Sequence, residues 1–297
     1  MKRDPVEWPT WFALIGMHGA WVAGLWAYGA AGLWICPVLA VIVAFHSSLQ
    51  HEALHGHPTR SAALNEALVS LPVGWVIPYR SFRDLHIRHH NDARLTDPYD
   101  DPETWYLAEG DWDHLSLPMR ALLRMNATLA GRVTVGPWLM THGFLRAELR
   151  AMAVGNKRVM GAWGRHILGL IPVIAAIWAA GIPLWVYALG VVWPALSLLA
   201  VRTYIEHRAA HCPKQRSAIV EAGWFWSLLF LNNNLHRVHH ERPAVAWYKL
   251  PAIWRAERAR VLAENGGYYF PGYWEVARQW FITQREPVIH PSMRRRG

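Results

Sequence analysis

The sequence has few cysteines, and no pair of them is spaced for metal binding. Among 297 residues only Cys36 and Cys212 are cysteine, and they form no Cys-x-x-Cys motif. This excludes a disulfide scaffold and a thiolate metal site, while reduced thiols suit a chain that faces the cytoplasm. The chain also lacks internal repeats and low-complexity tracts.

Charge is absent from two long stretches. Residues 8–50 and 166–201 contain no Asp, Glu, Lys or Arg. A membrane-spanning helix needs roughly 20 apolar residues, so each stretch is long enough for two short helices joined by a tight turn. We expect the turns near residues 29–32 and 181–183, where glycine and proline occur. The first stretch is too long for a cleavable signal peptide and predicts a membrane anchor.

Basic residues flank the ends of these stretches that lie opposite the uncharged turns. They are Lys2, Arg3, Arg146, Arg150, Lys157, Arg158, Arg165, Arg202 and Arg294 to Arg296. We expect a multi-pass protein of the cell inner membrane, and the positive-inside rule places both termini in the cytoplasm. The net charge of +9 is explained by contact with anionic membrane lipids. No nucleic-acid partner is expected, because the basic residues form no patch with interleaved aromatic side chains.

Histidine occurs in three motifs with the spacing of metal ligands. The motifs contain His51 and His55, then His86, His89 and His90, and finally His236, His239 and His240. On an α-helix, residues at i, i+3 and i+4 share one face, so each motif predicts imidazoles directed at a single point. Three such motifs beside apolar stretches indicate a polynuclear metal site at a membrane surface.

The number of histidines favours two metal ions. Neutral imidazole suits iron, zinc, copper and nickel, and about nine imidazoles provide four or five ligands for each of two ions. A closed zinc tetrahedron would leave too many histidines unused. Two irons fit better, because ferrous iron with nitrogen ligands and an open position can activate O2.

The sequence between the motifs sets a layout for the chain. Only 30 residues separate His55 from His86, and crossing the membrane twice would take about 40. This segment is therefore predicted to dip into the membrane or lie along its surface, with Pro72, Gly74 and Pro78 interrupting it. We expect one domain over residues 1–297: a first hairpin (8–50), a cap with interfacial helices (51–165), a second hairpin (166–201) and a cytoplasmic region (202–297).

In order and spacing, the three motifs resemble the histidine boxes of the membrane-bound fatty acid desaturase and hydroxylase superfamily. The resemblance covers about residues 40–251 and rests on His51-Glu52-Ala53-Leu54-His55, His86-Ile87-Arg88-His89-His90 and His236-Arg237-Val238-His239-His240. It implies an all-α integral membrane protein with four transmembrane helices and a cytoplasmic helical cap. It also implies a diiron centre that uses O2 to attack an unactivated C–H bond of a lipid-like substrate.

The flanks of the third box favour one branch of the superfamily. Asn232 to Asn234 and Trp247-Tyr248-Lys249-Leu250-Pro251 resemble bacterial desaturase-like members. We therefore predict a fatty acyl desaturase. The alternative is a hydroxylase or monooxygenase that acts on an alkane, a lipid or an isoprenoid.

Two candidates compete for a ninth ligand. Ile205-Glu206-His207 resembles the extra histidine segment of alkane hydroxylases, and Ala209-Ala210-His211 that of acyl-CoA desaturases. On a helix, their i, i+4 spacing would place both imidazoles on one face. Both are retained as candidates, and His207 is favoured.

Further polar residues are candidates to orient the ligands, because metal-bound imidazole usually donates its second N–H to a carboxylate or a carbonyl. They are Glu52, Asp92, Asp97, Asp100, Asp101, Glu206 and Asn233. For the acids between Asp97 and Asp101, a solvated turn is an equal alternative. Asn232 to Asn234 are expected to cap the helix of the third box, or to hold a metal-bound water.

Two other functions use the same residues. His51-Glu52-Ala53-Leu54-His55 is also the HExxH motif of zinc proteases, but that reading leaves the other boxes unexplained. A non-catalytic metal carrier or sensor would bind exchangeable metal without oxygen chemistry. The oxygenase hypothesis requires a separate electron donor, since the chain has no haem or iron–sulfur cysteine pattern. A ferredoxin, a rubredoxin, or a b-type cytochrome with its reductase is expected, and an acidic donor would suit the basic face.

Overall fold

The computed structural model describes residues 4–291, apart from the side chain of Asp92. The basic residues predicted at the two chain ends, Lys2, Arg3 and Arg294 to Arg296, lie outside the described residues. The chain is mostly helical and forms two compact units. The first unit contains the chain up to Arg83 together with Trp138–Leu199, and the second contains Asp84–Pro137 and the chain from Ala200 onward.

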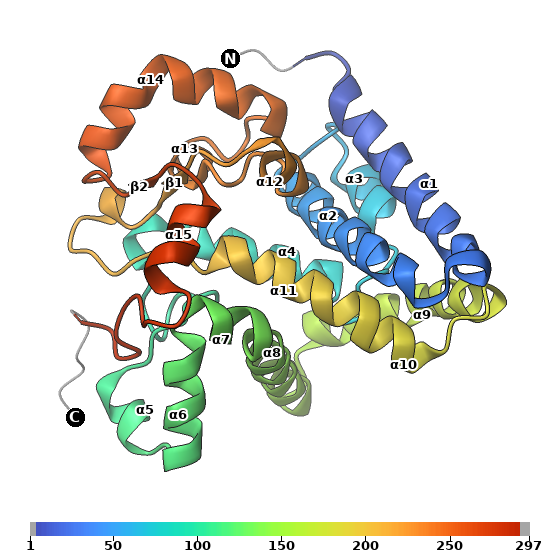
Figure 1. The fold of residues 1–297 in the computed structure, drawn as a ribbon, viewed down its shortest axis with the longest axis horizontal. Coiled ribbons are helices and arrows are strands. Elements are labelled where there is room, and N and C mark those ends of the chain that lie inside the picture. Colours follow the sequence, from blue (N-terminus) through green and yellow to red (C-terminus); the bar gives the residue numbers. More distant parts are fainter. Residues whose placement is uncertain (1–3, 292–297) are drawn as a thin grey trace. The chain divides into compact units, whose positions relative to one another are not determined.

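The first unit begins with a helical hairpin. Helices α1 (Trp8–Ala31) and α2 (Cys36–Leu54) are joined by a 3-10 turn (Gly32–Ile35) and lie side by side (Figure 1). Gly24 allows the close approach, because a Cβ atom there would lie 2.7 Å from Cδ2 of Leu39. The predicted first hairpin is confirmed, and its second helix carries His51 in the last turn.

The second apolar stretch also folds back. It contains α9 (Lys157–Ala179), α10 (Leu184–Tyr187), a π-helical turn (Ala188–Val192) and α11 (Trp193–Thr203). The predicted turn is confirmed, with Gly181 at φ 73°. The helix α9 begins at Lys157, before the charge-free stretch that starts at residue 166, and the bounds of the membrane hairpin stay a prediction. At the start of α9 the side chain of Asn156 accepts hydrogen bonds from the backbone N–H groups of Arg158 and Val159, which caps the helix earlier.

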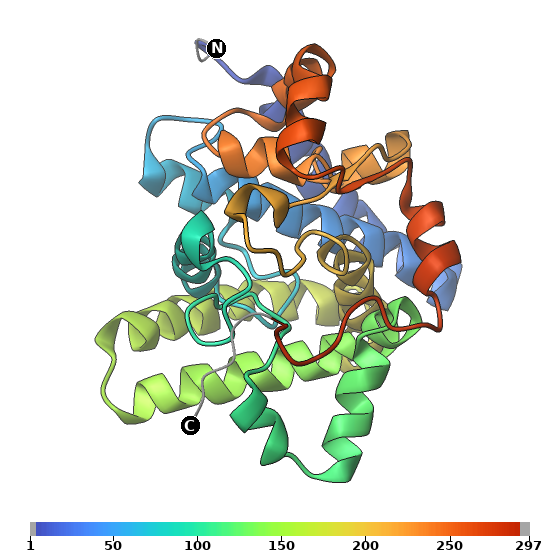
Figure 2. The ribbon, with the colours of Figure 1, turned by 90° about the vertical axis from the view of Figure 1, so that its left-hand side faces the viewer.

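Shorter elements surround these helices within the first unit. α8 (Gly136–Ala153) runs beside α9 (Figure 2), where Trp163 Nε1 donates to Glu148 Oε2 at 2.9 Å. After the first histidine box, α3 (Ala62–Val69) is followed by irregular backbone in which Trp75 has a φ of 62°. The predicted interruption is confirmed, and the depth of this segment in a membrane stays a prediction.

Three helical stretches among the described residues are long and apolar enough to cross a membrane. They are Trp8–Leu54, Lys157–Ala179 and Leu184–Thr203. The first folds back at its 3-10 turn. These stretches indicate a membrane protein, and the expected four crossings with a cytoplasmic cap stay a prediction.

The second unit consists of short helices around a small sheet. The helices are α4 (Tyr79–His89, which starts in the first unit), α5 (Glu109–Asp113), α6 (Leu117–Asn126), α7 (Leu129–Thr134), α12 (Trp224–Leu229), α13 (His236–Glu241), α14 (Leu250–Glu264) and α15 (Tyr273–Trp280). Strand β1 (Ile219–Val220) pairs in parallel with β2 (Tyr269–Phe270). Residues 111–165 are helical as predicted, and their interfacial location stays a prediction.

Candidate metal centre

The third histidine box lies on α13, which is only six residues long. Such a short helix gains little stability from its own hydrogen bonds and depends on packing. Its apolar side of Leu235 and Val238 belongs to a buried cluster with Ile219, Leu250, Ile253, Trp254 and Val261. The backbone N–H of Arg237 also donates to Ala218 O at 2.9 Å. These contacts fix the direction of three buried imidazoles.

The predicted cap of this helix is wrong. Leu235 occupies the N-cap position of α13, and no side chain caps the helix. Asn232 donates instead to Trp247 O at 3.1 Å and Asn234 to Val220 O at 2.7 Å. Asn233 Oδ1 accepts from His236 Nδ1 at 2.9 Å. The asparagines therefore fasten the preceding loop and orient one ligand candidate.

Histidines from the second and third boxes gather in two groups within the second unit. In one, the ligand nitrogens of His89, His207, His236 and His240 lie within 4.8 Å of one another; in the other, those of His86, His90 and His239 do so. Each box divides its histidines, with i and i+4 in one group and i+3 in the other. For these two boxes, the prediction of a single point per box is wrong. At about 100° per residue, i+4 lies about 40° from i, and i+3 lies about 60° away in the opposite direction.

The group with His207 has the donor arrangement of a cation site. His207 Nε2 lies 2.9 Å from Nε2 of His89 and 2.9 Å from Nε2 of His236. His89 donates its Nδ1–H to Asp101 Oδ1 at 2.8 Å, and His236 donates its own to Asn233. In the neutral rings both Nε2 atoms then carry lone pairs, and one imidazole proton cannot satisfy both. A metal ion between the three nitrogens would satisfy all of them, so these residues fit a metal ion.

The other group is arranged in the same way. His86 donates its Nδ1–H to Glu103 Oε1 at 2.8 Å, while its Nε2 lies 2.9 Å from Nε2 of His90. His239 Nε2 lies 3.2 Å from the same His90 nitrogen. Glu103 was not among the predicted orienting residues. Its position one residue after Asp101-Pro102, in the loop that follows the second box, was the available signal.

Burial keeps most of these imidazoles neutral. It lowers the pKa of His207, His236 and His240 well below the usual range, and the neighbouring rings lower it further. Burial likewise lowers the pKa of His90 to about 3. For His89 the lowering by burial is outweighed by the carboxylates of Glu103 and Asp101, which raise its pKa to about 9. Neutral imidazole is the form that binds metal.

The two candidates for the ninth ligand are separated by the structure. His207 lies in the first group, whereas His211 is exposed and lies in neither group. The expected helix through both is wrong, because α11 ends at Thr203. The backbone is extended there instead, and His207 pairs with Ser217 in an antiparallel bridge.

The first box lies at the end of α2 in the first unit. The rings of His51 and His55 have centroids 4.8 Å apart, and Glu52 between them is buried. Glu206 Oε1 lies 3.3 Å from His236 Nδ1 and 2.9 Å from Nε of Arg202. The structure thus places Glu206 beside a ligand candidate, as expected of an orienting residue.

The remaining predicted acids lie in a turn. Asp97 Oδ1 accepts hydrogen bonds from the backbone N–H groups of Tyr99 and Asp100, and Asp100 pairs with Arg94. These contacts match the solvated turn that was weighed as the alternative. The side chain of Asp92 lies outside the described part of the chain.

Apolar helices long enough to cross a membrane, together with two groups of imidazoles that could hold metal ions, indicate a membrane protein with a candidate metal centre. The model of the fatty acid desaturase family matches residues 28–273, and the chain belongs to this family. None of the curated proteins matches the chain. The family match includes all three boxes and favours an oxidoreductase over the zinc-protease and metal-carrier hypotheses.

Proposed function

We propose that the protein is a membrane-bound, O2-dependent diiron oxidoreductase, and specifically a fatty acyl desaturase. The observation that carries the proposal is the division of two HxxHH boxes between two groups of imidazoles in a member of the desaturase family. A pair of metal ions requires two adjacent groups of ligands. The same two helices provide ligands to both groups, whereas one face of a helix would provide ligands to only one ion.

The proposed ligands follow from these groups. His89, His207, His236 and His240 hold one iron, and His86, His90 and His239 bind the other. We propose that His51 and His55 of the first box complete the second set. When bound, the irons supply O2 activation and abstraction of hydrogen from an unactivated C–H bond. Asp101, Glu103 and Asn233 hold the Nδ1 protons of three ligands, which keeps the Nε2 lone pairs directed at the metal.

The reaction sets the need for a partner. Desaturation removes two hydrogens from the acyl chain, and reduction of O2 to two waters takes two further electrons and two protons. A separate ferredoxin, rubredoxin or b-type cytochrome with its reductase supplies those electrons. The proposed location is the cell inner membrane, with both termini and the metal centre on the cytoplasmic side.

One observation favours hydroxylation as a second candidate. The histidine that joins the group is His207, whose segment resembles that of alkane hydroxylases, and not His211. A hydroxylase would abstract the same hydrogen and then insert oxygen. Small differences in substrate position, on the order of 0.5 Å, decide between the two outcomes.

The test is a lipid comparison combined with metal analysis. Membranes containing the protein or its His236→Ala variant are supplied with O2, reductant and a donor, and lipid extracts are compared by mass. A loss of two hydrogens supports the desaturase, and a gain of one oxygen supports the hydroxylase. About two irons per chain are expected in the unsubstituted protein, from nine ligands at four or five per ion. One tightly bound zinc and no oxygen-dependent product would refute the proposal.

A further inference from the structure

His207 differs from the other six histidines of the two groups because it lies neither on a helix nor directly after one. α11 ends four residues earlier, at Thr203, and residues 205–209 are irregular or extended. The histidines of the second and third boxes are fixed on or directly after α4 and α13. The position of His207 must therefore be set by groups from elsewhere in the chain.

Side chains distant in sequence bind the backbone on both sides of His207. Tyr268 donates its hydroxyl hydrogen to Ile205 O at 2.7 Å, and Arg285 Nη2 donates to His207 O at 2.8 Å. The N–H of Ala209 donates to the hydroxyl of Tyr106 at 2.9 Å. Side chains thus bind the backbone at residues 205, 207 and 209.

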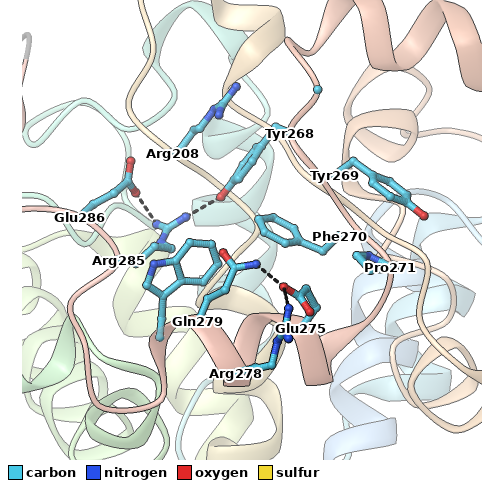
Figure 3. A pocket seen from close by; sticks show the side chains of 12 residues that line it. Arg208, Tyr268, Tyr269, Phe270, Pro271, Glu275, Arg278, Gln279, Arg285 and Glu286 are labelled. Carbon is cyan, nitrogen blue, oxygen red and sulfur yellow. Dashed lines mark hydrogen bonds and ion pairs between the residues drawn. The ribbon is translucent and has the colours of Figure 1, made fainter.

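These side chains form one connected network, which we term the clasp: Tyr106, Tyr268, Arg285 and Glu286. Arg285 donates to the Tyr268 hydroxyl and pairs with Glu286 at 2.6 Å (Figure 3). Tyr106 donates to the same carboxylate. Each hydroxyl accepts one hydrogen bond and donates one. The directions are therefore mutually consistent, and no donor competes with another.

The clasp has a rigid base. The backbone N–H of Arg285 donates to Ala127 O at 3.1 Å, and the N–H of Leu107 donates to Val288 O at 2.9 Å. The side chain of Arg285 is only 13% exposed. Because the backbone of Arg285 is held and its guanidinium is planar, the side chain loses little further conformational entropy when it binds a carbonyl.

We propose that Arg285 is a positioning residue for the metal ligand His207. The inference rests on the proposed function, since it takes His207 to be a ligand. Arg285 contacts no ligand nitrogen, and it acts through the carbonyl of His207 and, by way of Tyr268, that of Ile205. Without it the carbonyl of His207 loses a hydrogen bond that helps to hold the imidazole in position, and the bridge to Ser217 remains.

Arg278 offers a matched control. It lines the same hollow of about 600 Å³ as Arg285 but is largely exposed, and it pairs with Glu275 on its own helix (Figure 3). Replacing Arg278 removes a positive charge beside the same cavity but leaves the hydrogen bonds to residues 205–209 intact. Arg285→Met and Arg278→Met therefore separate positioning from surface charge.

The experiment measures Co²⁺ binding to the metal-free, full-length protein in detergent, by titration and by the visible absorption of bound Co²⁺. Arg285→Met is expected to weaken one of the two Co²⁺ sites about 10–100-fold and alter its absorption, as loss of a supporting residue does elsewhere. Arg278→Met should leave both sites unchanged. Arg285→Lys should recover part of the affinity, because one ammonium can reach the His207 carbonyl.

A His207→Ala background makes the test specific. There Arg285→Met should weaken Co²⁺ binding no further, because the ligand that it positions is gone. An equal further loss in that background, or unchanged affinity in Arg285→Met alone, would overturn the inference. If His207→Ala itself left both sites intact, the ligand assignment in the proposed function would fail instead. Should Arg285→Met not fold, Tyr268→Phe replaces it, with a weakening of about 10-fold expected at the same site.

Discussion

The second and third histidine boxes share the pattern HxxHH but are held in place differently. The second lies at the end of α4, an 11-residue helix, and its rings are oriented by carboxylates. The third lies on the six-residue α13 and is oriented by an amide and a buried apolar cluster. The motif supplies ligands in both cases, while the surrounding chain supplies their orientation.

The difference extends to burial of the orienting groups. Asp101 beside His89 has a side chain that is 1% exposed, whereas Glu103 beside His86 is 33% exposed. Charge in a buried position is screened less by water. Within the second box, the group that contains His89 should therefore depend more on its carboxylate than the group that contains His86.

The largest expected effect comes from removing one histidine from either box, which tests whether both boxes provide metal ligands. His89→Ala and His236→Ala should each abolish turnover and lower bound metal, because no neighbouring side chain can replace a missing imidazole in a buried site. The measurements are product formation and metal per chain. His211→Ala is the control and should retain both, since His211 is exposed. Normal turnover in either ligand variant would contradict the proposed site.

The next effect tests the role of the carboxylates. Asp101→Asn should weaken metal binding in the group with His89 by about 10–100-fold, because the amide orients the ring but no longer increases its basicity. Glu103→Gln should cost less, since Glu103 is partly exposed. Competition with a chelator measures both affinities. A larger loss in Glu103→Gln would reverse the comparison.

Much of the site was predictable because its signals are local in sequence. The charge-free stretches predicted the helices and both turns, and the spacing within each box identified six of the histidines that gather in the second unit. The segment around His207 was found through its resemblance to known families. The resemblance favoured His207 over His211 as a ligand but did not decide between them. The expected helix there was wrong because α11 ends at Thr203, and the sequence near His207 contains no signal for the end of a helix.

The residues that orient the histidines were harder to predict, because their role depends on how the loops that carry them fold back toward the histidines. Asp101 was named among several acids, but the sequence could not separate it from Asp97, which binds only its own turn. Asn233 was named both as an orienting candidate and as part of a helix cap, and only the structure separates the two, because it bonds His236 and caps no helix. The alternate division of each box between two groups follows from helix geometry, but only once both helices are placed.

A smaller effect concerns the amide of the third box. Asn233→Ala should weaken metal binding by less than about 10-fold, the lower limit for supporting residues, because Glu206 Oε1 already lies 3.3 Å from His236 Nδ1. The same chelator competition measures it, with Asp101→Asn as the reference. Combining Asn233→Ala with Glu206→Ala should remove both acceptors and give a loss larger than the product of the two. Independent effects would show that Glu206 does not replace Asn233.

The smallest effect on metal binding concerns the apolar support of α13. Leu235→Ala should lower the free energy of unfolding by about 2–5 kcal/mol, as truncation of a buried leucine does. It should also weaken metal binding a few-fold, because α13 is too short to stay in place without the cluster. Val261→Ala is the control: it truncates the same cluster from α14, away from the histidines. It should reduce thermal stability while leaving metal affinity unchanged. If both variants weakened metal binding equally, the cluster would stabilise the whole unit and would not specifically support the third box.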